Sequence, residues 1–335
     1  MENLVNSSPL ILVLVFLVIG FAFLMKGADF FVEGSSSIAK RLKVPPIIIG
    51  LTIVAMGTSL PETAVSVTAS LVNNNELAVS NVVGSNIFNL MVVVGVCSIL
   101  TPILVQKETI KRDIPFSMIC AFLLLGLGIL AVGDKSGMTL GHLDGMILLG
   151  FFAGYIVAMI QSAMKARAAG KNVEIEGIEE LEEEIGILSW PKSILFIVGG
   201  ALAIAFGGDL TVDAASRIAI DLGMSQTLVG LTIVSIGTSL PELVTSVVAA
   251  RKNEVDMALG NAIGSNIFNI LMVLGIASAI SPISIITENI IDLCVLIVFT
   301  ICAWIFAGTK KKIGRAEGLC MVALYAAYAV YIIVR

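Results

Sequence analysis

Long apolar runs separated by short polar clusters make up almost the whole chain. Dividing the sequence at the clusters of charged and turn-forming residues gives ten apolar segments of twenty residues or more. Each is long enough to cross the roughly 30 Å hydrocarbon core of a bilayer as an α-helix. The segments cover residues 9–40, 46–71, 77–100, 113–132, 142–164, 193–222, 226–250, 256–280, 289–308 and 315–334. None alternates with the period of two that is typical of a barrel strand, so the pattern predicts an all-α polytopic membrane protein with ten transmembrane helices.

The composition supports this prediction. Of 335 residues, 57% are hydrophobic and only 13% are charged, and the mean hydropathy of +1.02 is more apolar than a soluble core requires. The first and sixth segments are longer than a simple crossing, so we expect them to tilt or to continue past the bilayer. The N-terminal Met-Glu-Asn lacks the basic region of a signal peptide, and the first segment is expected to remain as a helix.

The basic residues predict the orientation. With the N-terminus outside the cell, sixteen of the twenty lysines and arginines fall in loops on the cytoplasmic side, as the positive-inside rule requires. We therefore expect a multi-pass protein of the cell membrane whose two termini are both extracytoplasmic.

An acidic segment separates the fifth and sixth apolar segments. Residues 174–184 contain seven glutamates, which is typical of a solvated linker. A regulatory cation sensor is less favoured because no spaced ligand loop is present. The predicted organisation is a first five-helix repeat at 1–165, an acidic cytoplasmic linker at 166–191 and a second five-helix repeat at 192–335.

The two halves repeat each other at a constant offset of 180 residues. The sequence GLTIVAMGTSLPE at 50–62 returns as GLTIVSIGTSLPE at 230–242, identical at eleven of thirteen positions, and NVVGSNIFN at 81–89 returns as NAIGSNIFN at 261–269. The residues that are identical in both copies are mostly polar ones, whose burial in lipid is energetically costly. Duplication of a fold alone would preserve only the apolar pattern. Because five helices make one repeat, the second copy is expected to cross the membrane in the opposite sense, as in the inverted repeats of secondary transporters.

Each GTSLPE motif places a carboxylate near the middle of a predicted span. An ionised acid at that depth is disfavoured by about 2.5–3.5 kcal/mol on insertion scales, and neither motif has a nearby lysine or arginine to offset this. Pro61 cannot donate to the carbonyl of Gly57, so backbone oxygens are expected to leave the helical ladder, and the second copy repeats the arrangement. Thr58 and Glu62 are four residues apart and are expected to share one face.

The candidate ligands are all oxygen donors. The second motif adds a serine and an asparagine at i and i+4 in each half, and the full set is Glu62, Glu242, Thr58, Thr238, Ser59, Ser239, Ser85, Ser265, Asn89 and Asn269. Hard cations such as Ca²⁺, Na⁺ and Mg²⁺ match these ligands, and transition metals match them poorly. Two carboxylates carry a formal charge of about −2, which one divalent ion neutralises. Mg²⁺ resists the dehydration that an all-protein cage demands, so Ca²⁺ is favoured.

Other interpretations remain open. Helix packing alone explains one proline-kinked helix with small residues, but it is disfavoured for two copies that each carry a mid-depth glutamate. A passive channel is a second alternative, because inverted repeats with half-helices also build pores. An intramembrane hydrolase using the paired acids would not need the doubled Thr, Ser and Asn set. We expect no enzymatic activity, no cofactor and no nucleic-acid partner.

At these residues the chain resembles the calcium/cation antiporter superfamily, and within it the sodium/calcium exchangers. The resemblance rests on GTSLPE twice and GSNIFN twice, with the ten-span inverted arrangement covering nearly the whole chain. It implies that Glu62 and Glu242 are the central bidentate ligands and that the long first and sixth helices slide as a gate. By matching position it also implies, as contacts of Ca²⁺ and Na⁺, the hydroxyl residues Thr58, Ser59, Ser85, Thr238, Ser239 and Ser265.

One position departs from the family pattern. Sodium/calcium exchangers carry Asp at the position of Asn269, opposite an Asn that matches Asn89, whereas here both are Asn. Asn can take neither a proton nor a negative charge, so the site has one titratable group fewer. The expected function is secondary active antiport of Ca²⁺ against Na⁺ by alternating access, with a monomer in the lipid bilayer as the functional unit. A Ca²⁺/H⁺ antiporter, or a K⁺-dependent one, that uses the same glutamate pair is the alternative.

Overall fold

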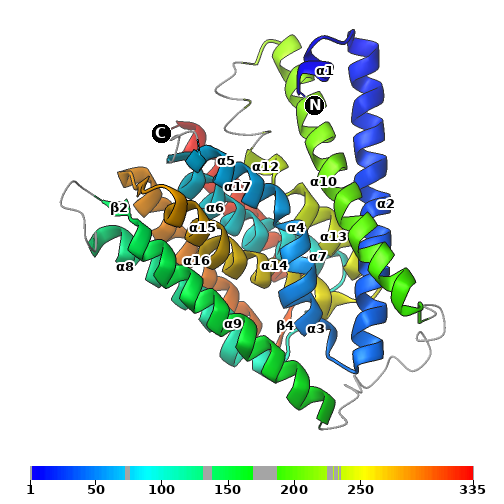
Figure 1. Cartoon of the computed structure of the whole chain (residues 1–335), viewed down its shortest axis with the longest axis vertical. Helices are drawn as coiled ribbons and strands as arrows, with labels where there is room; N and C mark the ends of the chain where they lie inside the picture. The colour runs from blue at the N-terminus through cyan, green and yellow to red at the C-terminus, as the bar shows by residue number, and fades with distance from the viewer. Residues whose placement is uncertain are drawn as a thin grey trace.

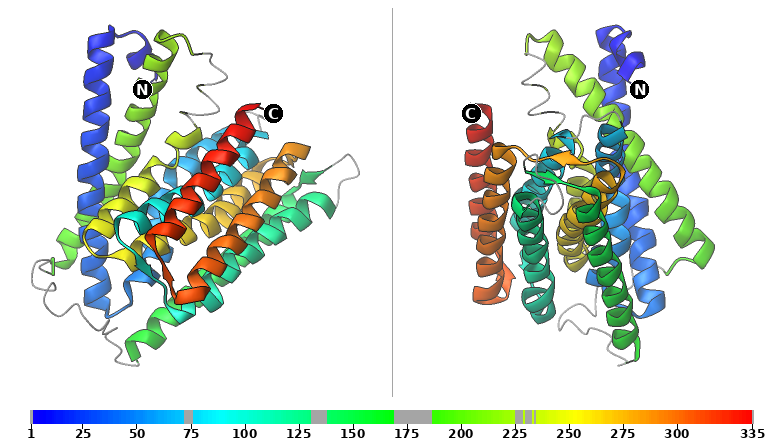
Figure 2. Two further views of the ribbon diagram at one scale, coloured as in Figure 1. Left: turned by 180° about the vertical axis from the view of Figure 1, so that it is seen from behind. Right: turned by 60° about the vertical axis from the view of Figure 1, so that its left-hand side comes forward.

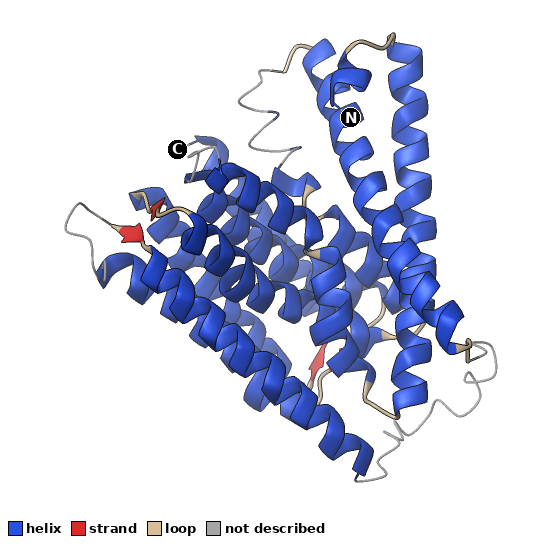
Figure 3. Cartoon of the chain, in the orientation of Figure 1, coloured by secondary structure: helices blue, strands red, loops and turns tan. Residues whose placement is uncertain are grey.

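The computed structural model of the chain describes residues 2–71, 76–130, 138–168, 187–224, 229, 233 and 235–334. Within these residues the protein is almost entirely helical, and the strands are four of two residues each (Figure 3). In the same residues, eight helices are long and apolar enough to cross a membrane, and a ninth span results when the bent pair Pro46–Thr58 and Leu60–Leu71 is taken as one. The prediction of an all-α polytopic fold is confirmed.

The helical elements are α-helices and short π-helical segments, and the latter are labelled η. Those of the first half are α1 (Glu2–Asn6), α2 (Leu10–Leu42), α3 (Pro46–Ile49), η1 (Gly50–Val54), α4 (Ala55–Thr58), α5 (Leu60–Leu71), α6 (Glu76–Phe88), η2 (Asn89–Val93), α7 (Val94–Leu100), η3 (Thr109–Asp113), α8 (Ile114–Leu130) and α9 (His142–Ala168). Those of the second half are α10 (Trp190–Asp221), α12 (Ser235–Gly237), α13 (Leu240–Arg251), α14 (Val255–Phe268), η5 (Asn269–Val273), α15 (Leu274–Ile280), α16 (Thr287–Lys310) and α17 (Arg315–Val334).

Two short antiparallel ladders join loops of the two halves, and the apolar pattern did not predict them. Strand β1 (Ile103–Leu104) pairs with β4 (Lys312–Ile313), and β2 (Thr139–Leu140) pairs with β3 (Ile283–Ser284). Each ladder ties a loop of the first half to a loop of the second, so the halves are connected outside the helical core as well as within it.

Nine of the predicted spans coincide with observed helices or helix pairs to within a few residues. The largest differences are at α9, which continues to Ala168 instead of ending at 164, and at the fourth span, which begins at Thr109 instead of 113. The seventh predicted span, 226–250, is described only in part, as α12 and α13. Most of the predicted acidic linker also lies outside the described residues, which resume at 187 after 168.

The helices that carry the repeated polar motifs lie at the centre of the molecule. The spans Ala78–Leu100 and Val255–Ile280 are mostly buried, whereas Leu10–Leu42 and Arg315–Val334 expose most of their apolar side chains. Every residue of α14 from Asp256 to Phe268 is buried. The outer helices therefore shield the polar motifs from lipid, which is the arrangement that intramembrane polar residues require.

Helices α2 and α10 form a long antiparallel pair that is inclined to the other helices and projects beyond them (Figures 1 and 2). With 33 and 32 residues, each is about 50 Å long, which exceeds the thickness of the hydrocarbon core. Glycines allow the backbones to touch: a Cβ on Gly27 would lie 3.0 Å from the carbonyl oxygen of Gly200, and one on Gly20 would lie 3.0 Å from that of Gly207. Small residues at such contacts favour close helix packing in membranes.

Replacing Gly200 by Val is expected to destabilise the protein by about 1–3 kcal/mol, the usual cost of overpacking. A Cβ at this position would lie only 2.7 Å from the backbone of Gly27. The neighbouring Gly199 provides a matched control, because a Cβ there meets no atom within 4 Å. Thermal unfolding of the two purified variants in detergent measures the difference, and equal midpoints would contradict the close contact of α2 with α10.

Candidate cation site

Both GTSLPE motifs lie at breaks between helices. In the first copy α4 ends at Thr58 and α5 begins at Leu60, with a bend of 47° between the two parts of the span. Pro61 accounts for the break, because it has no N–H to donate to the carbonyl oxygen four residues earlier. In the second copy α12 ends at Gly237 and α13 begins at Leu240. The interruptions expected from the sequence are present in both halves.

Glu62 is held by hydroxyl groups from both halves of the chain. It lies in the first turn of α5, where the positive end of the helix dipole stabilises an anion. Its side chain is fully buried. Ser85 of α6 donates to Glu62 Oε1 at 3.4 Å, and Ser239, at the break in the second half, donates to the same oxygen at 3.5 Å. The second GTSLPE copy thus contributes directly to the site around Glu62.

Glu242 is held in the corresponding way. It is fully buried in the first turn of α13. Ser265 of α14 donates to Glu242 Oε1 at 3.4 Å, and Ser59, at the break in the first half, donates to it at 3.2 Å. The two carboxylates are close enough to interact electrostatically. Each acid therefore receives one hydroxyl from its own half and one from the other half.

Each threonine hydroxyl contacts an asparagine of the opposite half. Thr58 Oγ1 donates to Asn261 Oδ1 at 3.0 Å, and Thr238 Oγ1 donates to Asn81 Oδ1 at 3.2 Å. The sequence predicted that Thr58 and Glu62 share one face. In the structure α4 ends at Thr58, so the helix break falls between the two residues, and the shared face stays a prediction.

One oxygen of each carboxylate remains available. Glu62 Oε2 and Glu242 Oε2 are buried and have no hydrogen-bond partner among the described residues. None of the ion pairs in this part of the chain involves either acid. A buried charge without a partner is strongly destabilising. The pair of carboxylates therefore suits a bound cation or a proton.

A chain of amide hydrogen bonds orients Asn269, the first residue of η5. Asn86 Nδ2 donates to the backbone carbonyl oxygen of Asn266 at 3.1 Å. Because a carbonyl oxygen can only accept, this bond fixes the direction of the Asn86 amide. Its Oδ1 then accepts from Asn269 Nδ2 at 3.1 Å. The remaining polar atom, Asn269 Oδ1, is buried without a partner in the described structure, so it is free to act as a neutral oxygen ligand.

Asn89 occupies the matching position at the start of η2. It is fully buried, and neither Nδ2 nor Oδ1 has a hydrogen-bond partner among the described residues. Asn266 Nδ2 donates to the backbone carbonyl oxygen of Asn86 at 3.1 Å, which completes a reciprocal pair of bonds between α6 and α14. Both asparagines of the predicted ligand set thus begin π-helical segments, which often occur at functional sites.

The ten predicted ligands fall into three groups. Seven of them form the two carboxylate clusters. Thr58 belongs to these clusters because its Oγ1 lies 3.4 Å from Ser265 Oγ. The seven are Glu62, Ser85, Ser239, Glu242, Ser59, Ser265 and Thr58. Asn89 and Asn269 lie on the π-helical segments. Thr238 is half-buried and bonded to Asn81.

Four further asparagines support the ligands, and the sequence interpretation did not include them. All belong to the second repeated motif and are identical in both copies, which is the signal that could have identified them. They are Asn81, Asn86, Asn261 and Asn266.

The donor set favours a hard and exchangeable cation. Among the described residues, no group of three or more His, Cys, Asp or Glu side chains is placed to hold a metal ion. The two acids are instead surrounded by hydroxyl and amide oxygens. Such ligands suit Ca²⁺ or Na⁺ and suit transition metals poorly.

Comparison with known proteins agrees with this chemistry. The family model described as Sodium/calcium exchanger protein matches residues 12–161 and 192–334. The chain belongs to this family. Sodium/calcium exchanger MaX1 of Methanosarcina acetivorans is 34% identical over 338 residues, covering 94% of this chain and 96% of MaX1. Inner membrane protein YrbG of Escherichia coli K12 is 32% identical over 311 residues, covering 91% of this chain and 92% of YrbG.

A solved exchanger shares the fold. The sodium-calcium exchanger NCX_Mj, in crystals soaked with Na⁺ and Sr²⁺, superimposes with a TM-score of 0.80 at 32% identity, covering 95% of this chain and 98% of NCX_Mj. The sodium/calcium exchanger family consists of membrane transporters for Na⁺ and Ca²⁺ and not of enzymes. With its apolar helices, the chain is a multi-pass membrane protein of that family.

Proposed function

We propose that this family member is a secondary active antiporter that exchanges Ca²⁺ for Na⁺ by alternating access. One observation carries the proposal: two fully buried carboxylates from repeated motifs, each held by hydroxyls of both halves, each keep one oxygen without a partner. Glu62 and Glu242 bind the ion directly in this proposal. The other eight predicted ligands complete the ion contacts.

The proposed architecture is ten spans in two inverted five-helix repeats, at 1–165 and 192–335, joined by a cytoplasmic linker at 166–191. The antiparallel contact of α2 with α10 supports it, because Gly20 and Gly27 of α2 correspond to Gly200 and Gly207 of α10 at the offset of 180. The reciprocal bonds between Asn86 and Asn266, also 180 residues apart, support it as well. Inverted repeats of this kind carry substrate near the midplane at their interface.

Charge explains the obligatory coupling. One Ca²⁺ neutralises the formal charge of about −2 on the two acids, and Na⁺ competes for the same oxygens. An empty site would leave two unpaired charges buried, which makes reorientation without an ion costly. Only the occupied forms switch between the two sides of the membrane. The functional unit is a monomer in the cell membrane, with both termini extracytoplasmic.

Sodium-driven exchange is directly testable in sealed vesicles. We expect an outward Na⁺ gradient to drive ⁴⁵Ca²⁺ uptake, and collapse of that gradient to stop it. A proton gradient and a K⁺ gradient, each imposed without Na⁺, test the Ca²⁺/H⁺ and K⁺-dependent alternatives. The amide of Asn269 cannot take a proton, so in the Ca²⁺/H⁺ alternative Glu62 and Glu242 carry the protons. Uptake driven by H⁺ alone would reject sodium as the coupling ion.

A further inference from the structure

Two charged side chains of the loop between α13 and α14 hold helix α2. Ser36 Oγ of α2 donates a hydrogen bond to Glu254 Oε1. Lys252 Nζ lies 3.6 Å from Asp29 Oδ1 and donates to the backbone carbonyl oxygen of Asp29 at 3.1 Å. The Ser36 side chain is buried, and a hydrogen bond to an ionised acceptor is stronger than a neutral one. We call these contacts of Lys252 and Glu254 with α2 the α2 latch.

The α2 latch fixes the part of α2 that covers the first GTSLPE motif. Phe31 is buried and lies between Asp29 and Ser36 along α2. Its ring packs against Gly57, where an added Cβ would lie 2.5 Å from Phe31 Cζ. Gly57 directly precedes Thr58 of the candidate cation site. While the latch is closed, an aromatic ring therefore covers the cation site next to Thr58.

Neighbouring contacts show which end of each central helix faces the latch. Gln106, which follows α7 and β1, donates to Asp256 Oδ2 at the start of α14 at 2.6 Å. The span Ala78–Leu100 therefore ends beside the start of α14, next to the latch. Asn81 lies near the beginning of that span and so at the opposite end, whereas Asn261 lies in α14 about two turns from the latch.

The cation site is more deeply buried on the latch side than on the opposite side. Thr58 and Asn261, which are hydrogen-bonded to each other, are both fully buried. Their counterparts Thr238 and Asn81 form the matching hydrogen bond, but both are half-buried. The structure is therefore closed on the latch side, and its opposite side is closer to water.

The two halves of the sequence differ at the latch. At the offset of 180 residues, α10 keeps the polar partners of the latch as Asp209 and Ser216. The matching loop residues are Val72 and Asn74, neither of which carries a charge. A charged latch can therefore form on one face of the molecule only. Two identical halves would make the two orientations of an inverted repeat equal in energy, whereas this difference favours the orientation in which the latch is closed.

We propose that the α2 latch biases the exchanger toward the state that is closed to the cytoplasm and open to the outside. The inference rests on the proposed alternating access, in which α2 leaves Gly57 when the site opens to the cytoplasm. The loop contains Arg251 and Lys252, and the positive-inside rule assigns such a loop to the cytoplasm. Lys252 and Glu254 are positioning residues, because they act on the cation site through α2.

Hydrogen exchange of the full-length protein in detergent measures opening on the latch side. Residues from Asp256 to Asn261 are buried at the start of α14, so their amides exchange slowly while this side is closed. Glu254→Ala removes the charge-assisted bond and should accelerate exchange in this segment about tenfold. Lys252→Gln should accelerate it only about two- to fivefold, because water screens a partly exposed ion pair. Adding Ser36→Ala to Glu254→Ala should cause no further change, since both remove the same bond.

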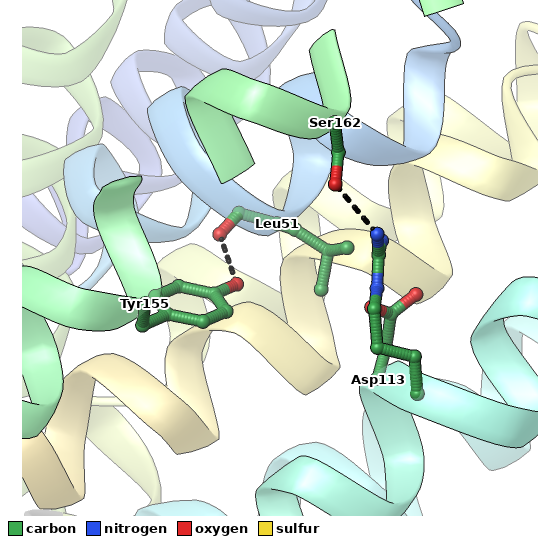
Figure 4. A network of polar contacts seen from close by, with 5 residues as sticks. Leu51, Asp113, Tyr155 and Ser162 are labelled. Carbon is green, nitrogen blue, oxygen red and sulfur yellow. Dashed lines mark hydrogen bonds and ion pairs between the residues drawn. The ribbon is translucent and has the colours of Figure 1, made fainter. Parts of the chain in front are cut away.

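Two variants provide matched controls. Arg251→Gln removes a positive charge next to the latch, at an exposed residue that makes none of the ion pairs in the described part of the chain. Ser162→Ala removes a hydroxyl that accepts from Arg112 Nη1 at 2.7 Å, in a contact that does not involve α2 (Figure 4). Neither control should change exchange at the start of α14. Equal exchange in Glu254→Ala and Arg251→Gln would overturn the proposal.

Calcium uptake in sealed vesicles of known orientation separates a latch from a merely structural contact. In Glu254→Ala the half-saturating Ca²⁺ concentration at the cytoplasmic face should fall about tenfold, because the state that binds Ca²⁺ from this face is populated more often. A local loosening of the loop would not lower this value, so an unchanged or higher value would contradict the latch. Absence of Na⁺-driven uptake in wild-type protein would reject the proposed function instead, whereas hydrogen exchange tests the latch without transport.

Discussion

Glu62→Gln is expected to lower the affinity for Ca²⁺ on the order of 100-fold or more and to abolish Na⁺-driven Ca²⁺ uptake. Removing one partner from a buried ionic interaction costs about 3–5 kcal/mol, and each 1.4 kcal/mol corresponds to a factor of about ten in affinity. Gln keeps the size of the side chain and can still accept from Ser85 and Ser239. The substitution therefore removes charge with little change in packing. Glu242→Gln should have the same effect, because Glu242 has the corresponding partners.

Two measurements separate this loss of charge from a loss of folding. Isothermal titration with Ca²⁺ gives the affinity, and thermal unfolding without Ca²⁺ gives the stability. Glu288→Gln is a suitable control, since Glu288 is exposed in the first turn of α16. A Glu62→Gln variant that still conducts Ca²⁺ passively, with altered selectivity, would support a channel and contradict the antiporter. Wild-type affinity in both variants would contradict direct ligation by the two acids.

Asn86→Ala is expected to weaken Ca²⁺ or Na⁺ binding by roughly 10- to 100-fold and to lower the melting temperature. The substitution leaves Asn269 Nδ2 and the carbonyl oxygen of Asn266 without their partners. A buried polar group left unsatisfied costs about 1–3 kcal/mol. Once released, the Asn269 amide no longer has a fixed direction, and its oxygen no longer faces the ions permanently. The effect on affinity thus arises through a residue that need not touch the ion.

Asn289→Ala is the matched control for this prediction. Asn289 is buried and also makes two hydrogen bonds, to Ser80 Oγ at 2.8 Å and from the backbone N–H of Ile286 at 3.2 Å. It lies on α16, outside both carboxylate clusters. We expect Asn289→Ala to lower the melting temperature without changing ion affinity. If the two variants lose affinity to the same extent, Asn86 has only a structural role.

Hydropathy located the spans well because the bilayer imposes a simple requirement of length and apolarity on each helix. Hydropathy did not predict the structure beyond the hydrocarbon core, where that requirement no longer applies. The helix α9 continues to Ala168 because a helix can extend into water beyond the hydrocarbon core, and the apolar pattern does not report that extension. The short ladders β1–β4 and β2–β3 form between loops, where apolar periodicity carries no information.

The sequence by itself determined which residues form the candidate site. An identical string of polar letters in two apolar spans has few physical explanations, and it singled out Glu62, Glu242 and the hydroxyl residues that the structure gathers around them. Only the tertiary structure decided which group meets which. Ser59 donates to Glu242 of the other half rather than to the acid of its own motif. The direction of the Asn269 amide is set by Asn86, which is not among the predicted ligands. Spacing along a chain predicts neighbours only within an unbroken helix, whereas these contacts cross helix breaks and depend on how α6 and α14 pack together.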